Sequence, residues 1–351
     1  MINTYSSTIR RREMEAVLTC MVDEHLGPGE SALRLMQSVK EAIGCDGGIA
    51  LRSPSLALEY ALKALELPQD GGVMISALAP AWQLLTVEKL GYKPMVLDVA
   101  EDCGLVTPQA VENAMKEGGR LLLLTESMGV LPDIKAFLSL GIPIVEDISQ
   151  SALARYPSEE EGEPQKPGRR AGMYGVYTIF GMEDRDIITA GGGAVLFAPG
   201  RREWIILKRL ADAAPSTDLM PDMNAALAQV ELKEYERNEA VRRELFALYS
   251  RAIVSGRHKT YVRASDDGST IYSFPVVLNA GFKDVKSYSQ KKGIEVRQAY
   301  ENSVIALRQE SLAPACICAN SLLLRCALFP LYPRLGKKDA ERIVKVLSSL
   351  P

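Results

Sequence analysis

The chain has 351 residues, of which 47% are hydrophobic and 24% are charged, so it can bury a large core and does not have the composition of a disordered protein. Its net charge of -3 comes from 41 basic and 44 acidic residues that are interspersed along the sequence. This leaves no basic stripe for a phosphate backbone and argues against nucleic acid as a partner. No apolar run approaches the roughly 20 residues that span a bilayer, and the N-terminus lacks the apolar core of a signal peptide, so we expect a cytoplasmic protein without membrane contact.

The length favours two unequal domains, because single hydrophobic cores usually stop growing before this size. We place a large domain at residues 1–235 and a small C-terminal domain at residues 236–351. The six cysteines are scattered, and the Cys316 and Cys318 pair has no nearby histidine to complete a metal site. We therefore expect reduced, structural thiols and no bound metal.

Short apolar runs alternate with stretches of helical period between about residue 47 and residue 200, which predicts an α/β domain with a mostly parallel sheet covered by helices. One predicted helix, at residues 107–117, opens with Thr107 as a cap and Pro108 at its first position; another covers residues 56–67. The predicted strands cover residues 72–78, 93–99, 120–127, 142–148, 175–180 and 192–198.

The remaining elements are predicted from a change of pattern after residue 200. Residues 222–254 form one long helical pattern of the kind that bridges two domains. The later segments IYSFPVVLN, FKDVKSYSQKKG, IEVRQAY and KKDAERIVKVLSSL then predict a strand, a helix, a strand and a final helix, a smaller α+β unit. The polar segment at residues 157–172 predicts an exposed loop.

The segment IPIVEDISQSALARY carries the strongest chemical signal, because a buried strand ends in Glu146 and Asp147 and Gln150 follows. A carboxylate at the end of such a strand can hold a cationic ring nitrogen, which keeps a pyridine cofactor protonated. The alternative is that Asp147 only caps the following turn, and on these residues alone that alternative is the more frequent one. A glycine run then precedes the strand at residues 192–198, where backbone could approach a ligand.

With these motifs the chain resembles the DegT/DnrJ/StrS family of sugar aminotransferases, fold-type-I enzymes that use pyridoxal phosphate, over nearly its whole length. Asp147 and Gln150 in EDISQS stand where the family places the partner of the pyridine nitrogen and a residue beside the ring oxygen. Thr178 fills the place of a phosphate-binding serine, and residues 190–193 look like the family's Gly-Glu-Gly-Gly run. The segments VEKLGYKPMVLDV, KKGIEVRQAY and CALFPLYPRLGKKDAERIV are similar to the family's as well.

The chain departs from the family at the lysine that forms the Schiff base with the cofactor. Counting back from the glycines places Arg185 there, and counting forward from Thr178 places Glu183 there; residues 167–207 contain no lysine. The family's dehydratases carry a histidine at this position, and the two histidines here lie far from it in sequence. A guanidinium stays protonated and does not form an imine, so Arg185 could supply only charge or hydrogen bonds.

Other expected cofactor contacts are also altered. The family's Ser-Gly-Thr phosphate cradle reads Ser53, Pro54 and Ser55 here, and proline removes one backbone donor, although Ser55 could still bind an anion. The family's Asn and Arg, which reach a neighbouring subunit's site, align with Thr217 and Leu219. 

Trp82 lies two residues from the place of a ring-stacking aromatic residue, and a tryptophan in an amphipathic helix is more often simply part of the core.

These observations leave three hypotheses. The chain is an active aminotransferase acting on a nucleotide-linked keto sugar with a lysine from an unexpected position, or a relative that has lost transamination and keeps a polar pocket for a sugar nucleotide or a partner protein. In the third, pyridoxal phosphate binds without a covalent link through Asp147, Gln150, Thr178 and Ser55. The resemblance also implies a homodimer and a setting in polysaccharide or antibiotic-sugar biosynthesis.

Overall fold

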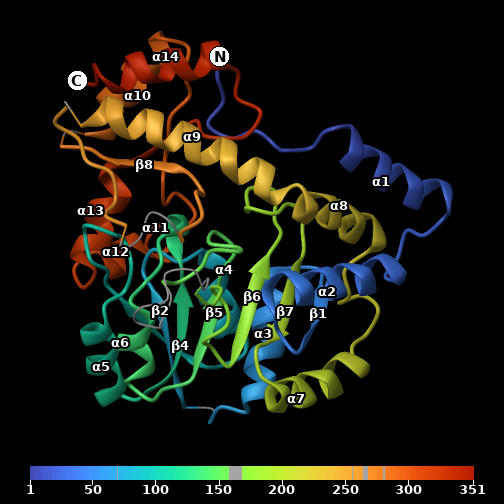
Figure 1. Ribbon diagram of the computed structural model, residues 1–351. Helices are drawn as coiled ribbons and strands as arrows, with labels where there is room; N and C mark the ends of the chain where they lie inside the picture. The colour runs from blue at the N-terminus through green and yellow to red at the C-terminus, as the bar shows by residue number, and fades with distance from the viewer. Residues whose placement is uncertain (69, 158–167, 255, 264–267, 280) are drawn as a thin grey trace, which may run out of the picture.

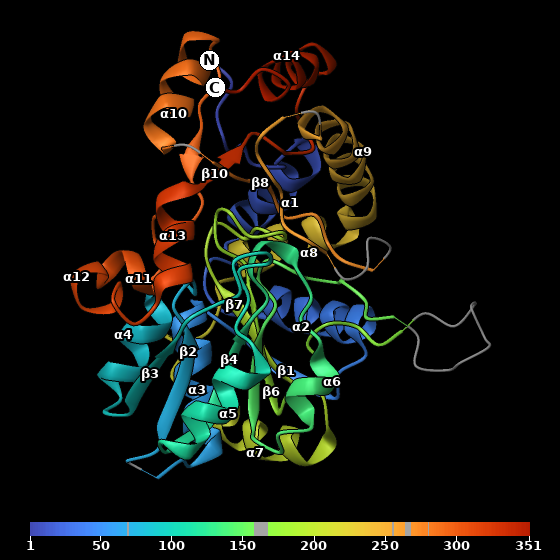
Figure 2. The same ribbon diagram turned by 90° about the vertical axis from the view of Figure 1, so that its left-hand side faces the viewer.

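The computed structural model describes residues 1–68, 70–157, 168–254, 256–263, 268–279 and 281–351. A seven-stranded sheet wrapped by helices forms the larger body, and a three-stranded sheet with its own helices lies at the other end, near both termini (Figure 1). The helix α9 (Tyr235–Ile253) runs between them (Figures 1 and 2). The predicted domain boundary between residues 235 and 236 falls at the start of this helix and stays a prediction.

The large sheet has the strand order β1-β7-β6-β5-β4-β2-β3. The five strands β2 to β6 pair in parallel, and only β7 runs against its two neighbours. This confirms the predicted α/β class with a mostly parallel sheet. The strands are β1 (Gly47–Leu51), β2 (Gly72–Ser76), β3 (Lys93–Leu97), β4 (Gly119–Thr125), β5 (Ile144–Asp147), β6 (Tyr177–Gly181) and β7 (Ala194–Ala198).

Both faces of this sheet are buried, which explains why its strands are continuous apolar runs in the sequence. In β4, Leu122 and Leu124 join one hydrophobic cluster, while Leu121 and Leu123 join the cluster on the opposite face. Burying each such side chain contributes about 1.5–3 kcal/mol. The first face is covered by α2 (Glu30–Ile43), α5 (Pro108–Lys116), α6 (Ile134–Leu138) and α8 (Asp222–Lys233), and the second by α3 (Pro54–Leu65), α4 (Ala81–Lys89) and α7 (Arg201–Asp212).

The start of α5 shows how local sequence sets an element. Thr107 accepts a hydrogen bond at 3.2 Å from the backbone N–H of Ala110, and Pro108 occupies the first helical position, where no N–H is needed. The predicted cap is therefore confirmed, and losing it would cost about 1 kcal/mol.

The small sheet has the order β8-β10-β9, and both of its pairings are antiparallel. Its apolar face packs with α9 and α14 into a third hydrophobic cluster. Two further elements lie outside this unit. They are the short 3-10 helix at Ser127–Gly129, which follows β4, and the first helix, α1 (Arg11–Val22). The C-terminal elements are β8 (Phe274–Val277), α10 (Phe282–Lys291), β9 (Arg297–Gln298), α11 (Val304–Leu307), α12 (Gln309–Leu312), α13 (Ile317–Arg325), β10 (Cys326–Phe329) and α14 (Lys337–Leu347).

The structure differs from the predicted elements in several places, and the helices α1 and α2 and the strand β10 are among the elements that were not predicted. The long helical pattern is two helices, α8 and α9, because the backbone of Glu234 (φ -89°, ψ 1°) leaves the helical region between them. The strand β1 was not predicted. The predicted loop at residues 157–172 lies mostly outside the described residues. Within the described residues, no helix combines the length and apolar character needed to cross a membrane.

Candidate active site

A cavity of about 410 Å³ lies where β4 and β5 end and α3 and α4 begin. In open α/β sheets, ligands collect beyond the carboxyl ends of the strands, so this position agrees with the rule for the fold. We call it the strand-end cavity. It is lined by Ser53, Pro54, Ser55, Pro80, Trp82, Thr125, Asp147, Ser149, Gln150, Glu183, Asp184, Arg185, Asp186 and Asn302.

Asp147, the last residue of β5, is a buried carboxylate in the wall of this cavity. Its Oδ2 accepts a hydrogen bond at 2.8 Å from the side-chain amide of Gln83, which also donates to Thr125 at 2.9 Å. Its Oδ1 accepts from the backbone N–H of Ser149 at 3.1 Å and from the Ser149 hydroxyl at 2.5 Å. Burial raises the pKa of Asp147, and the bonds from Ser149 and Gln83 oppose that rise.

The Ser149 bonds form the turn that follows β5, so the capping role considered for Asp147 is present. The same carboxylate also lines the cavity, so capping and ligand contact are not exclusive here. The Ser149 hydroxyl also accepts from the backbone N–H of Gly181 at 2.9 Å. A Cβ at Gly181 would lie 2.4 Å from the Ser149 oxygen and 2.7 Å from Asp186 Oδ2, so this strand end requires glycine.

The start of helix α3 lines the same cavity. The Ser53 hydroxyl caps the helix by accepting from the backbone N–H of Leu56 at 3.2 Å, and it lies 2.9 Å from the Ser55 hydroxyl. Pro54 has no N–H to offer. The first turn therefore keeps only the N–H and hydroxyl of Ser55 for an anion, a smaller cradle than a helix start with three free donors.

Arg185 lines the cavity from the segment between β6 and β7. Its Nη1 is 3.5 Å from Glu301 Oε1, its Nε is 3.8 Å from Asp184, and its guanidinium lies 4.6 Å from the ring centre of Tyr5. Within the described part of the chain, no lysine lines the strand-end cavity. The arrangement offers hydrogen bonds and positive charge, but no amine that could bond to an aldehyde.

A second group of carboxylates surrounds Asp147. Asp186 lines the cavity, and burial together with the nearby charge of Asp147 raises its pKa to about 8. Deeper in the core, Glu126 accepts hydrogen bonds from the hydroxyls of Ser151 and Tyr156, and burial raises its pKa to about 8 as well. The protein therefore concentrates acid groups at this end of the sheet and disfavours the ionised form of several of them.

The other predicted site residues lie in different surroundings. Gln150 lines the cavity, but its side-chain oxygen accepts from the backbone N–H of Met128 at 2.7 Å. Trp82 is half-buried and lines the cavity. The buried hydroxyl of Thr178 donates to the carbonyl of Gly172 at 2.7 Å, and this residue does not line the cavity. Ser55, Trp82, Asp147, Gln150 and Arg185 are thus brought together, and Thr178 is not.

Sequence reasoning missed Gln83, Ser149 and Asn302. Ser149 could have been found, because an aspartate two residues before a serine is a common turn pattern. Gln83 could not, since it meets Asp147 across 64 positions and only the packing of α4 on the sheet brings the two together. Asn302 reaches the cavity from the C-terminal part of the chain.

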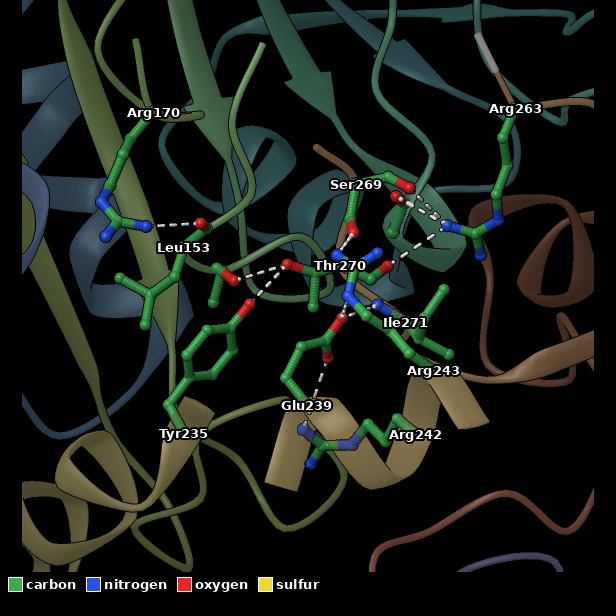
Figure 3. Close-up of polar contacts among 12 residues, drawn as sticks. Leu153, Arg170, Tyr235, Glu239, Arg242, Arg243, Arg263, Ser269, Thr270 and Ile271 are labelled. Carbon is green, nitrogen blue, oxygen red and sulfur yellow. Dashed lines mark hydrogen bonds and ion pairs between the residues drawn. The ribbon is translucent and has the colours of Figure 1, made fainter. Parts of the chain in front are cut away.

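A network of polar contacts joins α9 to the segment at residues 269–271 beside this site (Figure 3). Glu239 lies at its centre, accepting from the backbone N–H of Ile271 at 2.9 Å and pairing with Arg243 at 3.1 Å. Arg242 is farther away, at 3.9 Å. Burial raises the pKa of Glu239 to about 7, although the positive charges of Arg243 and Arg242 lower it.

Thr270 extends the network to the loop after β5. Its hydroxyl donates to the carbonyl of Ala152 at 2.8 Å and lies 2.9 Å from the Tyr235 hydroxyl, while Arg170 donates to the carbonyl of Leu153 at 2.6 Å (Figure 3). These bonds fix the start of α9 against the segment that follows Asp147, and so hold one side of the site in place.

The fold is that of pyridoxal-phosphate-type aminotransferases, and solved structures of this class superpose on nearly the whole chain. The aminotransferase TlmJ from Streptoalloteichus hindustanus matches with a TM-score of 0.87 at 17% identity, covering 99% of this chain and 98% of that one. The pyridoxal-phosphate form of the putative sugar aminotransferase Spr1654 from Streptococcus pneumoniae matches at 0.86 and 16% identity, over 97% and 96%. GDP-4-keto-6-deoxymannose-3-dehydratase with bound GDP-perosamine matches at 0.84 and 14% identity, over 99% and 100%.

The sequence itself identifies the family. Residues 7–348 match the model of the DegT/DnrJ/EryC1/StrS aminotransferase family, and the chain belongs to that family. The resemblance found from the motifs is thereby confirmed.

Proposed function

We propose that this protein has lost lysine-dependent transamination and uses the strand-end cavity to bind a small molecule of the nucleotide-sugar type. The observation that carries the proposal is that Arg185 and Glu183, the two residues that the motif count places at the family's lysine, both line the cavity with Asp147, and no described lysine does. The guanidinium of Arg185 cannot form an imine at neutral pH.

The residues present fit pyridoxal phosphate only in part. Asp147 would hold the ring nitrogen and Ser55 would contact the phosphate, at a helix start that Pro54 has deprived of one donor. When bound, this cofactor supplies an electron sink for carbanions. The described cavity lining offers no side chain for the covalent link, so we propose that any binding here is noncovalent.

Spectroscopy of the protein mixed with pyridoxal phosphate tests this proposal. We expect no adduct after borohydride reduction and digestion, and no new absorption band of a protein-bound imine. A reduced adduct on any lysine would refute the proposal and support the second candidate, an active aminotransferase. That candidate is supported by family membership and by the retained Asp147.

A variant pair separates noncovalent binding from no binding. If the cofactor gives a saturable signal that borohydride does not trap, Asp147→Ala should abolish it. Glu310→Ala, at an exposed position that does not line the cavity, is the matched control and should leave the signal unchanged.

We also propose a homodimer, supported by an exposed apolar stripe on α1. Met14, Leu18 and Met21 lie on one face of this helix at i, i+4 and i+7, and each is more than half exposed. Light scattering after size exclusion should give twice the chain mass, and Leu18→Asp should reduce it toward the monomer. A wild-type mass of one chain at micromolar concentration would contradict the proposal.

A further inference from the structure

Three cavities meet at Arg185. Besides the strand-end cavity, a cavity of about 520 Å³ lies between the N-terminal segment, residues 3–8, and the segment at residues 328–333. We call it the N-terminal cavity. A smaller space of about 120 Å³ shares lining residues with both cavities. Among the described residues, Arg185 is the only one that lines all three.

The positive charge of Arg185 is weakly compensated. Its ion pairs, 3.5 Å to Glu301 and 3.8 Å to Asp184, are longer than the roughly 2.7–2.9 Å of a charge-assisted hydrogen bond. Glu301 lies closer to Arg297, at 2.8 Å, so this one carboxylate is shared between two guanidinium groups. Asp184 is 79% exposed, and water screens its attraction. The ring of Tyr5 at 4.6 Å supports the guanidinium from one side.

The N-terminal cavity carries two more arginines. Arg297 lines it, and so does Arg242, a buried residue whose Nη1 has no hydrogen-bond partner and lies 3.9 Å from Glu239. A buried guanidinium that is loosely paired adds positive potential that solvent does not screen.

The acidic residues of the same cavity offset this charge only partly. Glu295 accepts a hydrogen bond from the backbone N–H of Thr4 at 2.9 Å. Asp186 has a raised pKa of about 8, so it is mostly protonated at neutral pH. The lining holds three arginines, Arg185, Arg242 and Arg297, against Glu295, the exposed Asp184 and the largely protonated Asp186, so a small excess of positive charge faces the cavity.

We propose that Arg185 binds the phosphate or carboxylate group of a small-molecule ligand whose remaining part occupies the N-terminal cavity. This deepens the proposed function and rests on it, because it assigns a charge-recognition role to the residue at the lysine position. The volume suits a ligand of ordinary metabolite size. Hydroxyl groups of Ser6, Ser7 and Thr189 in the wall suit a hydroxylated ligand. A guanidinium fork matches either oxyanion.

Calorimetric titration at low ionic strength tests the inference with two probes, inorganic pyrophosphate for the phosphate source and citrate for the carboxylate source. We expect saturable binding of at least one probe, weakened about tenfold or more by Arg185→Gln. Glu301→Gln should strengthen binding, because it removes the carboxylate that competes for Arg185. Circular dichroism should show that both variants are folded.

The matched control is Arg308→Gln, which removes an exposed arginine that pairs with Glu88 at 3.4 Å on the surface. It should leave the affinity unchanged. Equal affinities of the wild type and Arg185→Gln would overturn the inference. Two other results would also overturn it. One is that Glu301→Gln weakens binding as much as Arg185→Gln does, and the other is that the wild type binds neither probe at about 10 mM.

The two proposals fail in different ways. Anion binding that depends on Arg185, together with a borohydride-trapped cofactor, would refute the proposed function and leave the anion site standing. The opposite result, no trapped cofactor and no anion binding, would refute only the anion site.

Discussion

Replacing Glu126 by glutamine should change how the stability of the protein depends on pH. Glu126 follows β4, is fully buried, and accepts hydrogen bonds from the hydroxyls of Ser151 and Tyr156, the latter at 2.9 Å. Its pKa rises from 4.5 to about 8, first because of burial and then because of the negative charge of Glu146, with a smaller effect from Asp147.

The direction follows from proton linkage. Because the pKa of Glu126 is higher in the folded state, the folded protein holds this proton more tightly than the unfolded chain does. Its contribution to stability is complete below the unfolded pKa and is lost as the pH rises through the folded pKa. Going from about pH 6 to about pH 8.5 should therefore cost about 2 kcal/mol of unfolding free energy from this group, to order of magnitude.

Urea denaturation of both proteins at about pH 6 and pH 8.5 measures this effect. Glu126→Gln keeps the size of the side chain, and its amide can accept from one hydroxyl and donate to the other. Because Glu146, Asp147 and Tyr156 remain in both proteins, the difference reports Glu126 together with its electrostatic coupling to Glu146. The variant should gain about 2 kcal/mol relative to the wild type over this range. A difference in stability that stays constant with pH would refute the reasoning, and Glu310→Gln at an exposed position is the control.

Three further variants test the site. Arg185→Lys places an amine in the strand-end cavity and should yield a borohydride-trapped adduct with pyridoxal phosphate where the wild type gives none; an unmodified lysine 185 by mass spectrometry would contradict this. Gln83→Leu removes the 2.8 Å bond to Asp147 and should lower the unfolding free energy by about 1–3 kcal/mol at neutral pH, and unchanged urea midpoints would count against it. Thr270→Val leaves the carbonyl of Ala152 without its 2.8 Å donor, so thermal unfolding should show a loss of about 1–3 kcal/mol, in contrast to a neutral Thr19→Val on the surface.

The fold was predictable where burial imposes a simple pattern. Strands β2, β4 and β7 are mostly apolar runs, buried except at Arg120, and they stand out between helices of clear period. Strand β1 was missed because Gly47–Leu51 begins with two glycines, which favour no element. The glycines are required by packing: a Cβ at Gly47 would lie 2.5 Å from the ring of Trp204, and one at Gly48 would lie 2.5 Å from the carbonyl of Leu196.

The site residues could be predicted where a strand end or a family motif marks them in the sequence. Asp147 could be identified because it ends an apolar strand, and a parallel sheet gathers such ends at one edge. Thr178 was expected to contact a phosphate, yet the alternation of β6 turns its hydroxyl toward Gly172. The positions of Gln83 and Glu301 depend on packing across the whole chain, which no local pattern reports.

The surroundings of Asp147 support the proposed noncovalent binding of a cationic ring at this residue. Asp147 is buried, and the donors that reach it, Gln83 and Ser149, are neutral. Nearby Glu126 and Asp186 have pKa values raised to about 8, so these two carboxyls favour the protonated form when no cation is bound. A cationic ring nitrogen at Asp147 would favour the ionised carboxylate and relieve that cost. Arg185, which lines the same cavity, offers a complementary positive charge. A ligand with a cationic ring and an anionic group would satisfy both residues, without any covalent bond to the protein.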